Sequence, residues 1–206
     1  MSGIIAQNVG RHTGLMKAPS GGGTWNKISS ETASSSSSIS FTSSIDSTYK
    51  EYVFAFNNLH PSADQPHFQF QGSTNGGSSY GVTITSTNFQ TYYAESDAEY
   101  SLGYSTAGDL AQSTGYQRLF TEANNADDGC ITGYLHLFEP SSTSHVKNFL
   151  AIFQGSTDTS GSTENPYTWN QFISGYFNST SAIDAVDFKF SSGNIDSGSI
   201  TMFGVT

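Results

Sequence analysis

Apolar and polar residues alternate with a period of two along much of this chain. The alternation is clearest in 186–190, where three apolar residues flank Asp187 and Lys189, and in 67–71. A period of two predicts a β-strand with one buried face. The chain has no segment with the 3.6-residue period of an amphipathic helix. The pattern therefore predicts an all-β fold.

One strand, 49–57, is apolar on both faces. Tyr52, Phe54 and Phe56 share one face, and Val53 and Ala55 share the other. A strand of this kind is typical of the middle of a sheet, where both faces are covered. We therefore expect 49–57 to be a central strand.

Turn residues set the other strand boundaries. They predict separate strands at 80–85 and 89–93, and a long hairpin in which 116–120 returns against 100–105. The end of the chain is expected to be a closing hairpin of 186–190 and 200–205. Between its strands, Ile195 would plug the core, Gly193 and Gly198 would be required by the fold, and 196–198 would form a second turn.

Many short strands without helices favour an antiparallel β-sandwich, and a jelly roll is the topology we favour. Residues 25–206 are expected to form this single domain, and residues 1–24 an extended N-terminal arm. Two interpretations of the arm stay open, a disordered tail or a segment that a partner orders. For the second, the docking residues would be its apolar side chains: Ile4, Ile5, Val9, Leu15 and Met16.

The composition fits a sandwich with an aromatic core. There are 35 Ser, 22 Thr and 21 Gly, and only 35% of residues are hydrophobic. The 28 aromatic residues compensate, because each can bury about 150–250 Å². We expect Phe and Tyr to do the packing that Leu and Ile do in most cores.

The formal net charge of −10, with 7 Lys and Arg, excludes an electrostatic nucleic-acid binder and disfavours anionic membranes. The start of the sequence lacks the features of a secretion signal, and no apolar run is long enough to span a membrane. We therefore expect synthesis in a host cytoplasm without standard export and without membrane insertion. A single cysteine, Cys130, excludes an intramolecular disulfide.

The search for enzymatic chemistry predicts no catalytic residue. A glycosidase needs two carboxylates across a sugar bond, and Asp184 and Asp187 are the best-placed pair, but we expect both to face solvent. The aromatic residues are a stronger sign of sugar contact, although core packing is the more frequent use of such residues. The candidates for glycan contact are Tyr92, Tyr93, Tyr104, Trp169 and Tyr176.

No metal or cofactor site is predicted either. The five histidines, at 12, 60, 67, 136 and 145, show no pair with the spacing of zinc ligands. Asp127–Asp128 and Asn194 with Asp196 could offer oxygen ligands to calcium, but both are also good turn sequences. Gly21–Gly23 lacks the Lys-Ser/Thr of a phosphate loop.

Residues 1–19, MSGIIAQNVGRHTGLMKAP, resemble the start of small structural proteins encoded by tailed phages of marine bacteria. Segments 46–52, 57–61, 133–138 and 188–204 fit the same resemblance, which spans most of the chain. It implies a virion component. It carries over no catalytic residue, because none of these motifs has an assigned chemistry.

We therefore expect a non-enzymatic phage virion protein that decorates the capsid or tail or attaches to the host surface. The arm would dock to other virion proteins or to other copies, and a host-surface glycan is a further candidate partner. A homo-oligomer is expected, and a trimer would suit either role. The alternative is a carbohydrate-binding module without a virion role, which would be monomeric and have no use for the arm.

Overall fold

The protein is described from a computed structural model that covers residues 24–157 and 167–206. These residues form twelve strands and no helix, which confirms the all-β prediction. The strands are β1 (Trp25–Thr32), β2 (Ile39–Phe41), β3 (Glu51–Pro61), β4 (Phe68–Ser73), β5 (Ile84–Ala94), β6 (Tyr100–Tyr104), β7 (Gln117–Phe120), β8 (Ile131–Phe138), β9 (Lys147–Thr157), β10 (Tyr167–Phe177), β11 (Ala185–Phe190) and β12 (Ile195–Val205).

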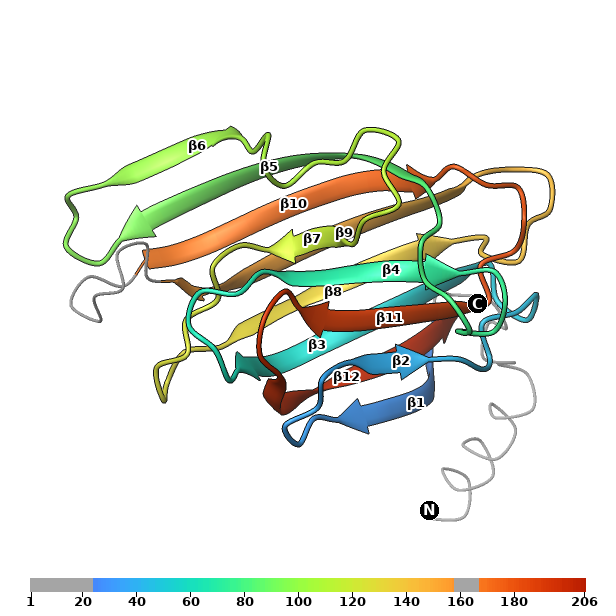
Figure 1. The fold of residues 1–206 in the computed structure, drawn as a ribbon, viewed down its shortest axis with the longest axis horizontal. Coiled ribbons are helices and arrows are strands. Elements are labelled where there is room, and N and C mark those ends of the chain that lie inside the picture. Colours follow the sequence, from blue (N-terminus) through green and yellow to red (C-terminus); the bar gives the residue numbers. More distant parts are fainter. Residues whose placement is uncertain (1–23, 158–166) are drawn as a thin grey trace, which may run out of the picture.

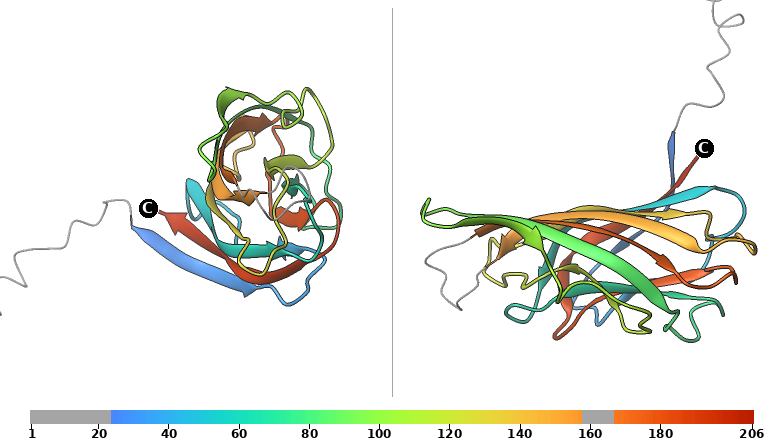
Figure 2. Two further views of the ribbon diagram at one scale, coloured as in Figure 1. Left: turned by 90° about the vertical axis from the view of Figure 1, so that its left-hand side faces the viewer. Right: turned by 90° about the horizontal axis from the view of Figure 1, so that it is seen from above.

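The strands form two antiparallel sheets of unequal size. The larger sheet has eight strands in the order β1-β12-β3-β8-β9-β10-β5-β6, and the smaller has four in the order β2-β11-β4-β7. The smaller sheet faces the viewer in Figure 1 and lies over one part of the larger sheet. Figure 2 shows the two sheets as the layers of a sandwich, with the ends of β1 and β12 side by side.

The topology is a jelly roll with insertions. The inserted strands are β5 and β6, between β4 and β7, and β9 and β10, between β8 and β11. Without these four, the remaining eight strands, numbered in chain order, form sheets 1-8-3-6 and 2-7-4-5. This is the strand order of a jelly roll, so the predicted topology is confirmed. All four insertions extend the larger sheet beyond β8.

Phenylalanines hold the two sheets together. Phe188 of the smaller sheet is fully buried, and its ring centroid lies 5.2 Å from that of Phe54 and 5.0 Å from that of Phe56 on β3. Three more phenylalanine rings lie within 6.3 Å of it: Phe41, Phe68 and Phe70. The expected aromatic core is therefore present, with β3 in the interior of its sheet as predicted.

The smaller sheet is too narrow to cover the inserted strands. Beyond β7, the chain between β6 and β7 pairs with the edge of β5, where the Ile84 N–H donates to the Ser113 carbonyl (2.7 Å). It reaches the inner side of β5 at Leu110, whose N–H donates to the Ser86 hydroxyl (2.9 Å). Buried polar side chains join this layer: the Ser86 hydroxyl donates to Gln117 (2.5 Å), whose amide donates to the Gly108 carbonyl (2.8 Å). The inner side of the inserted part of the larger sheet is therefore packed against a partly polar layer.

Three local predictions were wrong. The strands 186–190 and 200–205 are not a hairpin, because β11 belongs to the smaller sheet and β12 to the larger. Likewise β7 pairs with β4 and not with β6. The strands expected at 80–85 and 89–93 are one strand, β5, that begins at Ile84. In each case a pairing between distant segments decided the structure.

In the segment 186–205 at the end of the chain, the predictions for Ile195 and Gly193 agree with the structure. Ile195 is fully buried, and Gly193 has a φ of +70°. The turn predicted at 196–198 is instead a pair of irregularities inside β12, where Gly198 has a φ of +103°. A Cβ at Gly198 would lie 2.4 Å from the Asn58 carbonyl oxygen, so this bulge requires glycine.

The packing of Phe188 predicts that Phe188→Ala lowers the free energy of unfolding by about 3–5 kcal/mol, because a cavity opens at the centre of the ring cluster. Phe188→Leu should lose less, and Leu102→Ala, at a 74% exposed side chain, less than about 1 kcal/mol. Urea denaturation measures all three. An equal loss for Phe188→Ala and Leu102→Ala would contradict this account of the core.

Candidate functional site

The larger sheet has an outer face that points away from the smaller sheet. On it, Phe89 lies directly opposite both Tyr104 and Phe172, and Ile152 lies opposite both Phe172 and Tyr134. Since residues opposite each other on one face of a sheet are in contact range, they form a continuous line across the strands. We call this line the apolar row; from β6 to β3 it consists of Tyr104, Phe89, Phe172, Ile152, Tyr134 and Ala55.

Exposed apolar side chains are concentrated on this outer face. Tyr100 is 77% exposed and Leu102 is 74% exposed, both on β6. In the described residues, all nine large hydrophobic side chains classed as exposed point to this face: Trp25, Phe89, Tyr93, Tyr100, Leu102, Tyr104, Tyr134, Leu150 and Ile152. A contiguous exposed apolar patch of this kind marks an interaction surface.

The side chains of the outer face also pack against one another. The rings of Phe89 and Phe172 are stacked, with centroids 4.9 Å apart and planes at 8°. At the opposite edge, Trp25 packs edge-on against Tyr134 (5.6 Å) and against Phe203 (5.4 Å). These ring contacts join β5 to β10 and β1 to β8 and β12 on the outer face.

Formal charge is absent from most of this face. In the described part of the chain, no outward position of β5, β6, β8, β9 or β10 holds Asp, Glu, Lys or Arg. The nearest ionic contact is at β3, where Glu51 lies 2.5 Å from His136 Nδ1 of β8. At the β5–β6 edge, the hydroxyls of Tyr93 and Tyr104 donate to the carboxylates of Asp97 and Asp109, so negative charge borders the face there.

Two depressions interrupt the outer face. One, of about 550 Å³, lies over β5 and β6 and is lined by Tyr93, Tyr100 and Leu102 among others. The second, of about 360 Å³, lies over β9, β10 and β5, and its polar lining includes Asn148 and Tyr176. Both are mainly apolar, and the second also offers hydroxyl and amide groups.

The structure separates the five aromatic residues considered for glycan contact. Tyr93, Tyr104 and Tyr176 point to the outer face. Tyr92 and Trp169 point inward, with ring centroids 4.9 Å apart, and Trp169 is buried. Sequence analysis missed most of the exposed apolar residues, because Leu150, Ile152 and Phe172 look like core residues in the sequence.

The two carboxylates considered for glycoside hydrolysis are held by protein groups. Asp187 was expected to face solvent, but it is only 4% exposed and accepts hydrogen bonds from the hydroxyls of Ser40 (2.5 Å) and Tyr116 (2.9 Å). Asp184 accepts one from the Gly76 N–H (2.9 Å). Burial, and then the charge of Asp187, raise the pKa of Tyr116 well above its ordinary value. These hydrogen bonds hold the side chains of Tyr116 and Ser40 against Asp187 of β11.

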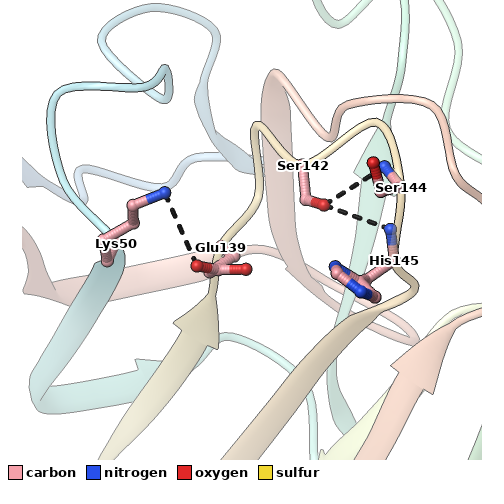
Figure 3. A network of polar contacts seen from close by, with 5 residues as sticks. All are labelled: Lys50, Glu139, Ser142, Ser144 and His145. Carbon is pink, nitrogen blue, oxygen red and sulfur yellow. Dashed lines mark hydrogen bonds and ion pairs between the residues drawn. The ribbon is translucent and has the colours of Figure 1, made fainter.

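Some of the candidate metal ligands take part in local hydrogen bonds. In Figure 3, the backbone N–H groups of Ser144 and His145 donate to the Ser142 hydroxyl, next to the Lys50–Glu139 ion pair (3.5 Å). Asp196 accepts from the Ser35 hydroxyl (2.6 Å). No group of three or more His, Cys, Asp or Glu that could hold a metal ion was found in residues 24–157 and 167–206.

Some predictions lie outside the described residues. These are the arm residues Ile4, Ile5, Val9, Leu15 and Met16, and also His12. The described chain begins at Thr24, immediately before Trp25 of the outer face. Within the described ranges, no helix is long and apolar enough to cross a membrane.

Comparisons with protein-family models, with curated proteins and with solved structures found no match for this chain.

His67 has the most strongly shifted histidine pKa in the described chain. Burial, with the charge of Arg118 as a second cause, lowers the pKa of His67 from 6.5 to about 4. Its Nδ1 accepts a hydrogen bond from the Glu122 N–H (3.2 Å), which requires a ring nitrogen without a proton. The fold therefore holds the neutral ring between β4 and β7.

This shift predicts a pH dependence of stability. Below pH 6.5, His67 is protonated in the unfolded chain, but in the folded chain it stays neutral down to about pH 4. The free energy of unfolding therefore falls as the pH is lowered from 6.5 to about 4. His67→Asn keeps an acceptor and removes the titration. The difference in urea midpoint between wild type and His67→Asn should therefore shrink or reverse as the pH is lowered. A difference that is constant over this range would contradict the assignment.

Proposed function

We propose that this chain is a non-enzymatic structural protein of a bacteriophage particle, displayed on the particle and held there by contacts with other protein subunits. It would decorate the capsid or tail or attach the particle to the host surface. The observation that carries the proposal is the outer face with its apolar row, whose outward strand positions from β5 to β10 carry no formal charge. A surface of this size without charge fits a protein partner.

Two further observations support the proposal. The likeness of residues 1–19 and 188–204 to structural proteins of marine phages gives the setting. The acidic surface away from the outer face, with a net charge of −10, would keep many crowded copies soluble. In this proposal the arm residues Ile4, Ile5, Val9, Leu15 and Met16 dock to other virion proteins.

One observation favours the alternative of a carbohydrate-binding module. The depression that includes Asn148 and Tyr176 also has Ser174 and Thr87 in its lining, with their hydroxyls 2.9 Å apart. Neutral hydroxyl and amide groups beside a tyrosine ring are suited to a neutral glycan. Two results together would favour this alternative over the proposal. A neutral glucan gel would retain the wild-type chain but not Tyr176→Ala, and the chain would be absent from phage particles.

The proposal predicts that the full-length chain copurifies with phage particles and that a chain lacking residues 1–24 does not. Tagged forms of both would be expressed in infected cells, and particles purified on a density gradient would be quantified by mass spectrometry. We expect at least a tenfold lower content of the truncated chain, since the arm provides the docking residues.

A full-length chain with Ser43→Lys, a change in the exposed loop after β2, is the matched control and should incorporate normally. Equal incorporation of the truncated chain would disprove docking through the arm. Absence of every form from the particles would disprove the virion assignment itself.

A further inference from the structure

The size of the outer face narrows the kinds of partner that could cover it. Eight strands about 4.8 Å apart span roughly 34 Å, and the longest of them, with 11 residues at about 3.3 Å per residue, are roughly 36 Å long, whereas β6 has only 5 residues. The face therefore offers about 1,200 Å² in projection. A stable protein interface buries about 800 Å² on each partner, so the face is large enough for a whole protein subunit.

The aliphatic side chains in the middle of the outer face argue against a sugar as its main occupant. Phe89 and Phe172 are stacked on each other, and Leu150 and Ile152 lie beside them, respectively 42% and 40% exposed. Aliphatic side chains offer a sugar neither a ring to stack on nor a hydrogen bond. They are suited to apolar side chains of another protein.

The lack of formal charge at the outward strand positions allows a partner that is itself acidic. Two bodies that both carry a net charge of −10 repel each other unless they meet through uncharged surfaces. The outward positions of β5, β6, β8, β9 and β10 form such a surface in the described chain. A basic partner would instead gain most from contact with the acidic surfaces. The distribution of charge therefore suits a second copy of the same chain.

The geometry of the row suits a second copy as well. Its side chains stand at the regular spacing of neighbouring strands, so the row of one copy can pack alongside the row of another. Sheets that pack face to face interdigitate their side chains in this manner. Glu51 and His136, a contact pair toward one end of the row, and Lys27 on β1 would lie toward the polar rim.

We infer that a second copy of this chain covers the outer face, with the apolar row at the centre of the contact. This deepens the proposed function by naming the partner, and it rests on that function for its biological setting. The test uses the purified full-length chain alone, so its outcome is independent of incorporation into particles.

Multi-angle light scattering over a range of protein concentrations tests the inference. The monomer has a mass of 22.0 kDa, and wild type should have at least twice this mass at micromolar concentrations. Ile152→Lys should raise the dissociation constant at least tenfold, because the lysine charge would be buried in the contact. Lysine also lowers the net negative charge, so dissociation would not be explained by stronger overall repulsion.

Two further variants make the result decisive. Leu102→Lys changes a side chain that is 74% exposed, which folding tolerates, and it should weaken assembly too. Ser43→Lys makes the same change of charge in the exposed loop after β2, near the smaller sheet, and should assemble like wild type. Circular dichroism checks that all three variants are folded.

Two results would overturn the inference. The first is a wild-type chain that stays monomeric up to about 100 μM, well above the range of specific interfaces. The second is an assembly that neither Ile152→Lys nor Leu102→Lys weakens. Such an assembly could also be one that is lost only when residues 1–23 are removed. In that case the arm, and not the outer face, would hold the copies together.

Discussion

The structure depends on one mismatch: an eight-stranded sheet with apolar side chains on both faces is packed against a sheet of only four strands. The inner face is covered by the phenylalanine cluster around Phe188 and, at β5, by buried polar contacts of Ser86 with Gln117 of β7 and with Leu110. Nothing in the described chain covers the exposed side chains of the outer face in the same way. The apolar row is thus the counterpart of the core, on the side of the sheet that the fold leaves open.

The inserted strands explain why this fold has such a face. A jelly roll formed by β1 to β4, β7, β8, β11 and β12 alone would have two sheets of equal size. Inserting β5, β6, β9 and β10 on one side doubles the larger sheet and adds most of the apolar row, including Phe89, Ile152 and Phe172. The outward positions of these four strands carry no formal charge, although the chain as a whole is strongly acidic. Size, apolarity and neutrality therefore come from the same segments.

Sequence reasoning predicted the fold class and topology but not the candidate site. Period-two alternation identified 186–190, and apolar residues on both faces of 49–57 correctly placed β3 inside a sheet. The same two-sided apolarity in β9 was not recognised: Phe149 and Phe153 are core residues, whereas Leu150 and Ile152 are exposed. Alternation cannot distinguish a strand covered on both faces from one whose second face awaits a partner. Pairing between distant segments, as of β11 with β2 and β4, is likewise absent from any local pattern.

The most direct test of the central claim, that the outer face is a protein contact surface, is oxidative footprinting of the full-length chain in its assembled form. Hydroxyl radicals label exposed aromatic and aliphatic side chains, and the Ile152→Lys monomer gives the reference labelling. We predict that Tyr100, Leu102 and Phe89 are labelled several-fold less in the assembly than in the monomer. Tyr49, whose ring lies against Gly204 and Tyr52 on the inner side of the larger sheet, should be labelled equally. Equal labelling of the three outer-face residues in both forms would contradict the account.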